Sequence, residues 1–133
     1  MKTKFDEIMD AFAARTGLAG LAPDAEGLYR FVVDGMELAV SALPDGRIVS
    51  LAEVGDVPPE GREQFYRTLL GAMFRLQGTN GAIFTVDEAT DRVFLRRVDA
   101  AAPDLDTLVV RLDGFVGVLS GWRQRVADFR PGA

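Results

Sequence analysis

The chain has 133 residues, of which 48% are apolar and 26% charged, so it can form the core of a single domain over residues 1–133 and is not a disordered chain. It contains no cysteine and no histidine, which excludes disulfides, Cys or His metal ligands and a Ser-His-Asp triad. Carboxylates, lysines and tyrosines could still carry chemistry, but the composition argues against an enzyme and indicates no cofactor.

The formal net charge is −5, which disfavours nucleic acid as a partner. An acidic balance keeps a protein soluble, and it can also attract basic segments of a partner. No apolar run approaches the roughly 20 residues that span a bilayer, so we expect no membrane insertion. Because residues 1–7 turn acidic at once and lack the apolar stretch of a signal peptide, we expect a cytoplasmic protein.

Residues 4–16 are predicted to form an amphipathic helix. Their large apolar side chains recur at positions i, i+3, i+4 and i+7 and so make one stripe: Phe5, Ile8, Met9 and Phe12. Thr3 can cap the first turn, and Gly17 is suited to the left-handed residue that ends a helix. A loop around Pro23 follows.

A meander of three strands is predicted between residues 26 and 51. The first strand, residues 28–33, has apolar side chains on both faces, which predicts a central position in the sheet. Asp34-Gly35 forms a tight turn, since both residue types tolerate positive φ. The second strand alternates apolar and polar side chains, and a turn at residues 44–46 leads to the third strand.

A second helix is predicted from about residue 60 to residue 76, after Pro58-Pro59 ends the meander. Its apolar side chains cover more than one stripe, so either the chain's own core or a partner subunit must cover part of them. A glycine-rich break at residues 78–81 separates this helix from a second hairpin, residues 82–86 and 92–98.

The last segment keeps a helical period over residues 105–126, with Asp104 as N-cap, although Asp113-Gly114 could instead turn a hairpin. The length of the period favours the helix. Gly117 and Gly121 lower helix stability, so we expect a compensating close contact, such as helix against sheet. The predicted order is α-β-β-β-α-β-β-α, an α+β fold with three helices and a twisted antiparallel sheet.

Two polar groups around the second hairpin are candidate sites. The loop at residues 87–91 carries three carboxylates that could ligate a hard cation, but it matches no complete calcium-loop pattern, and we expect no tight metal site. Arg92 and Arg96 lie on one face of a strand. There they could bind an anion or a partner's carboxylate, or form an ordinary solvated face.

The layout resembles that of the class I type III secretion chaperones, the Tir chaperone family, from Lys4 to about Val126. The clearest stretch is a leucine-rich helix end, a glycine-rich break, a strand, an acidic turn and an apolar strand: Leu69-Leu70-Gly71-Ala72-Met73-Phe74, Gly78, Gly81-Ala82-Ile83-Phe84, Asp87 and Arg92-Val93-Phe94-Leu95. A first helix followed by a meander with Asp-Gly turns matches as well. Asp91 stands where the family often has glycine, and the last helix has more glycine than usual.

The resemblance implies a homodimer that binds an unfolded segment near the N-terminus of a secreted effector, without ATP or chemistry. Effector binding would use the first helix and the sheet, with strand addition at an exposed edge. The expected partner-binding residues are Phe5, Ile8, Met9, Phe12, Arg92 and Arg96. The expected dimer interface on the second helix is Phe65, Leu69, Leu70, Met73 and Phe74. The alternatives are a core role for the first stripe, and a regulatory or small-ligand-binding dimer on the same fold without an effector.

Overall fold

The structure, a computed structural model, describes residues 2–132. These residues form three α-helices and five strands, with a short 3-10 helix after the second α-helix. In chain order the elements are α1 (Lys4–Thr16), β1 (Tyr29–Val33), β2 (Met36–Ala42), β3 (Ile48–Asp56), α2 (Arg62–Met73), η1 (Phe74–Leu76), β4 (Ile83–Asp87), β5 (Arg92–Asp99) and α3 (Leu105–Asp128). The predicted α+β class and the predicted order of elements are confirmed.

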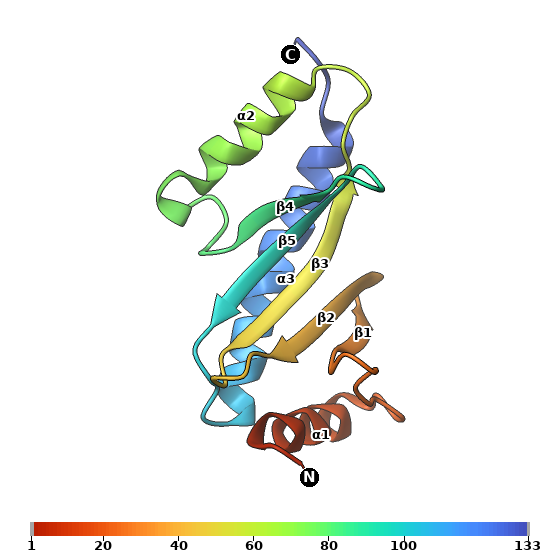
Figure 1. Cartoon of the computed structure of the whole chain (residues 1–133), viewed down its shortest axis with the longest axis vertical. Helices are drawn as coiled ribbons and strands as arrows, with labels where there is room; N and C mark the ends of the chain where they lie inside the picture. Colours follow the sequence, from red (N-terminus) through yellow and green to blue (C-terminus); the bar gives the residue numbers. More distant parts are fainter. Residues whose placement is uncertain (1, 133) are drawn as a thin grey trace.

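The strands form one antiparallel sheet in the order β1-β2-β3-β5-β4 (Figure 1). The prediction that the first strand is central is wrong, because β1 lies at one edge. Tyr29 and Phe31 are buried, whereas Val32, which points to the opposite face, is 58% exposed. The central strand is β3, since β5 returns from the second hairpin to pair with its free side. This long-range pairing is not visible in the apolar run of β1.

The third strand is longer than predicted. It continues past Leu51 to Asp56, because β5 offers it hydrogen-bonding partners over this whole length. A bulge between Glu53 and Gly55 absorbs a shift in register. The extension brings the end of β3 close to the C-terminal half of α3.

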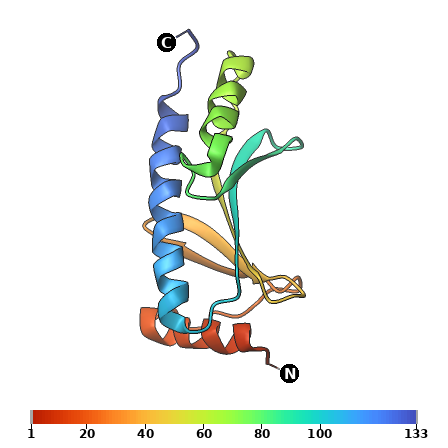
Figure 2. The same ribbon diagram turned by 90° about the vertical axis from the view of Figure 1, so that its left-hand side faces the viewer.

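α3 lies along one face of the sheet, called the inner face below (Figures 1 and 2). Its buried side chains follow the predicted helical period: Leu108, Leu112, Phe115, Leu119 and Trp122. The Thr107 N–H donates to the Asp104 carboxylate at 2.8 Å, so the predicted N-cap is present. The helix, and not the hairpin at Asp113-Gly114, is therefore confirmed. Over residues 2–132, no helix covers the opposite, outer face of the sheet (Figure 2).

The close contact expected at Gly117 and Gly121 lies elsewhere. Both glycines are on the solvent side of α3, and a Cβ added at either would meet no atom of the described residues within 4 Å. The close approach between helix and sheet is instead at Gly55, where a Cβ would lie 2.9 Å from Val126 Cγ1. A close contact between α3 and the sheet is therefore present, as predicted. The glycine that allows it lies on β3 and not on α3.

α1 and α2 lie at opposite ends of α3 (Figure 2). α1 crosses the N-terminal end of α3, and α2 lies beside its C-terminal half and β4. α2 is shorter than the predicted residues 60–76, because Arg75 adopts a φ of 69° and breaks the helix. The two short helices therefore lie at the two ends of an elongated molecule.

Candidate partner-binding surface

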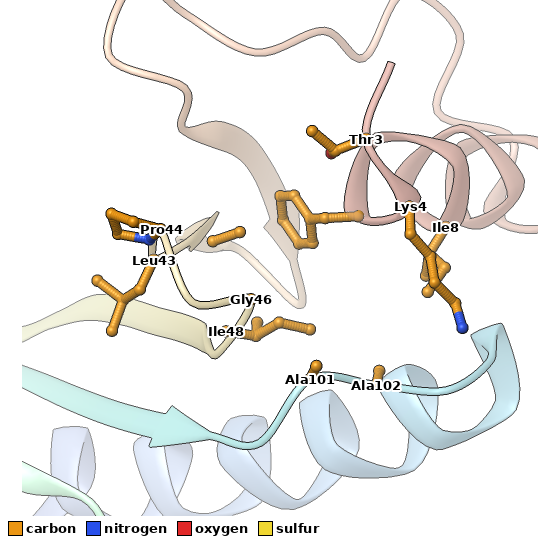
Figure 3. A pocket seen from close by; sticks show the side chains of 11 residues that line it. Thr3, Lys4, Ile8, Leu43, Pro44, Gly46, Ile48, Ala101 and Ala102 are labelled. Atoms are coloured by element: carbon orange, nitrogen blue, oxygen red, sulfur yellow. The ribbon is translucent and has the colours of Figure 1, made fainter. Parts of the chain in front are cut away.

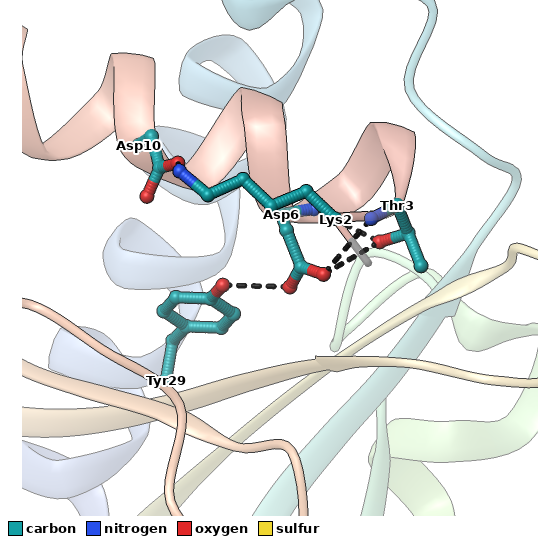
Figure 4. A network of polar contacts seen from close by, with 5 residues as sticks. All are labelled: Lys2, Thr3, Asp6, Asp10 and Tyr29. Atoms are coloured by element: carbon teal, nitrogen blue, oxygen red, sulfur yellow. Dashed lines mark hydrogen bonds and ion pairs between the residues drawn. The ribbon is translucent and has the colours of Figure 1, made fainter.

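Polar contacts hold the N-terminal end of α1 on the sheet (Figure 4). The Asp6 N–H donates to the Thr3 hydroxyl at 3.1 Å and the Thr3 N–H donates to the Asp6 carboxylate at 3.0 Å, which makes a capping box. The second oxygen of Asp6 accepts a 2.7 Å hydrogen bond from the Tyr29 hydroxyl on β1. This bond, followed by the Thr3 N–H, lowers the pKa of Asp6. Burial, followed by the bond to Asp6, raises the pKa of Tyr29.

The predicted stripe on α1 is divided between core and surface. Three of its four side chains are buried: Ile8, Met9 and Phe12. The Phe12 ring lies 5.0 Å from the Phe31 ring of β1. Phe5 is half-buried, with its ring edge-on to Tyr29 at 5.5 Å. Met9 is 0% exposed, so a partner could reach it only if α1 moved.

An apolar hollow of about 230 Å³ lies at the N-terminal end of α1 (Figure 3). It is formed where α1 meets the β2–β3 turn and the segment that precedes α3. Its apolar lining includes Phe5, Ile8, Leu43, Pro44, Ile48, Ala101 and Ala102. Ile8, although buried, thus borders a space that an apolar side chain of a partner can enter.

A second apolar hollow, of about 170 Å³, lies at the C-terminal end of α1. Phe12 lines it together with side chains from β1 and α3: Phe31, Val33, Val109, Leu112 and Val116. Arg15 and Asp113 add one basic and one acidic group to the lining. The stripe on α1 therefore faces a hollow at each of its ends.

β1, which supplies part of the second hollow, is also an open edge of the sheet. Over residues 2–132 it pairs with β2 alone, so the backbone groups that point away from β2 have no strand partner. An extended peptide can add to such an edge through main-chain hydrogen bonds. Val32, at this edge, is among the exposed large apolar side chains.

The predicted interface residues on α2 fall into two groups. Phe65 and Leu69 are buried inside the chain, and the Phe65 ring packs edge-on against Phe129 at 5.2 Å. Leu70 and Phe74 point outward and are 63% and 74% exposed. Met73 is half-buried, and its sulfur accepts a hydrogen bond of 3.1 Å from the Phe84 N–H of β4. Leu76 of η1 is exposed as well. Ile83 and Val86 of β4 are also exposed, but they point to opposite faces of the strand, since Ile83 pairs with Arg96 and Val86 with Val93.

Arg92 and Arg96 both lie on the outer face of β5, but only one of them is paired. Arg92 lies 3.4 Å from the Glu53 carboxylate and 3.7 Å from that of Asp56. No side chain of residues 2–132 forms an ion pair or hydrogen bond with Arg96.

Two of the three carboxylates of the acidic loop, those of Asp87 and Asp91, are engaged locally. Asp87 accepts a hydrogen bond of 3.0 Å from the Ala89 N–H, and Asp91 forms an ion pair of 3.1 Å with Arg62. Over the part of the chain that the structure describes, no group of three or more acidic residues is arranged to hold a metal ion. Nor does any helix in that part have the length and apolar character required to cross a membrane.

Sequence reasoning missed the valines that complete the second hollow, Val33, Val109 and Val116. Val109 and Val110 are adjacent and alike in sequence, yet the first lines the hollow and the second is 71% exposed. The helical phase set by Leu108, Leu112 and Phe115 could have separated them, because it places Val110 opposite the sheet.

Comparison with protein families gives a match over most of the chain. The model of the Tir chaperone protein (CesT) family matches residues 7–123. No curated protein matches the chain.

Three solved structures share the fold over most of their length. A chain in the ExsC–ExsE complex has a TM-score of 0.77 and 25% identity, with 98% of this chain and 96% of that chain covered. A chain in the HopA1–SchA chaperone–effector complex has a TM-score of 0.71 and 16% identity, with 90% and 93% covered. A chain in the heterodimeric ExoU–SpcU complex from the type III secretion system of Pseudomonas aeruginosa has a TM-score of 0.65 and 22% identity, with 89% and 93% covered.

Proposed function

This chain belongs to the Tir chaperone protein (CesT) family, and we propose that it is a cytoplasmic homodimeric chaperone that binds an unfolded N-terminal segment of a secreted effector and keeps it competent for secretion. The resemblance inferred from the sequence is confirmed at the level of the family. The family is a chaperone family and not a class of enzymes. The observation that carries the finer proposal is the pair of apolar hollows at the two ends of α1, beside the open edge of β1.

Such a surface suits an extended chain. A segment that pairs with β1 satisfies its own backbone groups, and its apolar side chains can enter the hollows in place of the core that an unfolded protein lacks. Burying one large apolar side chain contributes about 1.5–3 kcal/mol, so a few such contacts supply most of the binding energy. Because binding itself maintains the unfolded segment, no ATP or covalent step is needed.

The homodimer is the second part of the proposal. The outward side chains of α2 and η1 are large, apolar and exposed, which marks an interaction surface: Leu70, Phe74 and Leu76. Two copies related by a two-fold axis could each cover this surface of the other. Phe65 and Leu69 would then support the interface from within the subunit, with Met73 at its margin.

The test exploits two adjacent valines of α3. The chain is produced together with the N-terminal segment of the secreted protein encoded beside it, and retention of the segment is measured alongside a thermal melt of the free chain. Val109→Gln places an amide in the second hollow and should weaken retention, whereas the matched control Val110→Gln, on the solvent side, should not. Loss of retention only in step with a lower Tm would mean that the hollow is merely core.

The regulatory alternative makes a different forecast in the same assay. A dimer with this fold but without an effector should retain no neighbouring secreted protein, whichever variant is used. Its association through α2 should persist, because that surface is independent of the hollows beside α1.

A further inference from the structure

The outer face of the sheet carries a basic side chain without a partner. Arg30 on β1 lies 3.4 Å from the Asp24 carboxylate and 3.7 Å from that of Glu37. Arg97, on the inner face, lies 3.0 Å from the Asp99 carboxylate. Arg96 has no hydrogen bond, ion pair or aromatic contact with any residue of the described part of the chain.

Apolar neighbours surround Arg96. In the sheet register it lies opposite Leu51 of β3 and Ile83 of β4. Along β5 the next side chains on the same face are Phe94 and Val98, both half-buried. Arg96 is itself half-buried. The aliphatic stem of an arginine can pack against such neighbours while its guanidinium stays available to an acceptor.

The carboxylates on the same face are already engaged. Glu53, diagonal to Arg96, forms the ion pair with Arg92 at 3.4 Å. Asp87, at the far end of β4, accepts the Ala89 N–H at 3.0 Å. No carboxylate of residues 2–132 pairs with the Arg96 guanidinium, which is therefore available to one from another molecule.

We propose that Arg96 binds an aspartate or glutamate side chain of an extended, otherwise apolar segment of the secreted partner, which lies across the outer face. Charge complementarity selects this occupant, because the guanidinium fork fits a carboxylate and the surrounding side chains fit apolar groups. A hollow of about 280 Å³ beside it can take a neighbouring side chain of the segment, and its lining is both apolar and charged: Ala39, Leu51, Phe94, Arg30, Glu37, Glu53 and Arg123. The inference rests on the proposed function and names the chemistry that the partner must carry.

The first test compares the two arginines of β5 in the co-production assay with the neighbouring secreted protein's N-terminal segment. Arg96→Gln should weaken binding of that segment at least about tenfold, the effect of losing a charge-assisted hydrogen bond. Arg92→Gln, whose guanidinium is already paired within the chain, should weaken it less than about threefold. Equal losses for both variants would overturn the role of Arg96 and leave the proposed function standing. If the unaltered chain retains no segment, both proposals fail.

The second test identifies the carboxylate by charge exchange. Arg96→Glu should abolish retention, and replacing one particular Asp or Glu of the segment by Lys should restore it. Absence of rescue at every acidic position would contradict the proposal. If Arg96→Glu instead dissociates the dimer in light scattering, the occupant is a second copy of this chain and the proposal is overturned.

A measurement on the free chain separates binding from folding. Arg96→Met loses no side-chain hydrogen bond or ion pair within residues 2–132 and keeps an unbranched apolar stem, so its Tm should be unchanged or higher while its binding is impaired. A Tm lowered by more than a few degrees would assign Arg96 a structural role and contradict the proposal.

Discussion

The two short helices at the ends of α3 carry comparable apolar patterns and use them differently. α1 buries Ile8, Met9 and Phe12, whereas α2 buries Phe65 and Leu69 and leaves Leu70 63% exposed. α1 packs where the sheet meets the N-terminal end of α3, so its apolar stripe is largely buried. α2 lies beside the edge strand β4, which buries only one side of the helix. The spacing of apolar residues on a helix thus indicates which side chains should be buried. Only the tertiary packing decides whether the same chain or a partner buries them.

The largest expected effect separates the two helices by stability. Met9→Ala removes a side chain that is 0% exposed and should lower the free energy of unfolding by about 2–5 kcal/mol. Leu70→Ala, at a side chain that is 63% exposed, should change the free energy of unfolding of the monomer by less than about 1 kcal/mol. Urea denaturation followed by circular dichroism measures both. Similar losses for the two variants would break the contrast between core and surface.

Dimerisation should depend on the exposed side chains of α2 and η1 and not on the buried stripe of α1. Leu70→Asp and Phe74→Asp each place a charge on the exposed surface of α2 and η1 and should convert dimers to folded monomers, with Tm lowered only by the loss of association. Val110→Asp, at a valine that is 71% exposed on α3, is the control and should leave the dimer intact. Light scattering at micromolar concentration decides this, and a monomeric unaltered chain would refute the homodimer.

A smaller effect tests how α1 is held. Tyr29→Phe removes the hydrogen bond to Asp6 and should cost about 0.5–1.5 kcal/mol near neutral pH. Since the pKa of Asp6 is lowered in the folded state, its contribution is fully present above the ordinary carboxyl pKa. It is lost as the pH falls through the lowered value. The stability difference between the variant and the unaltered chain should therefore narrow in acid, and a difference that stays constant down to about pH 2 would contradict the assignment.

The smallest effects concern two exposed helical glycines. A Cβ at Gly71 of α2 or at Gly117 of α3 would meet no atom of residues 2–132 within 4 Å, so either change to Ala should stabilise the free chain by up to about 1 kcal/mol. Gly71 adjoins the exposed surface of α2 and η1, and Gly71→Ala should weaken association as well, because a methyl group would keep the partner's surface away. Gly117→Ala should leave association unchanged. Thermal melts and light scattering together test the pair, and the same response at both sites would argue against an interface on α2.

Signals within a few residues were enough to predict most of the elements. The bounds of α1 were predicted correctly because Thr3 and Gly17 supply the N-cap and the left-handed C-cap. The N-cap of α3 at Asp104 was likewise visible in the sequence. The position of β1 and the length of β3 were not, because both depend on β5, whose residues pair with those of β3 across separations from 36 (Asp56–Arg92) to 51 (Ile48–Asp99) positions in the chain.

For the candidate site, the sequence by itself determined which residue types are available, where the amphipathic helices lie, and which family the layout resembles. Only the tertiary structure distinguished Val109 from Val110 and Arg92 from Arg96, which are identical residue types at similar positions in the sequence. Helical phase separates the two valines, and the distance to the nearest carboxylate separates the two arginines. Capping, turns and periodicity are interactions between residues close in the chain, so the sequence displays them directly. The burial of an apolar side chain and the pairing of a charge depend on elements that are distant in the sequence and come together only in the folded chain.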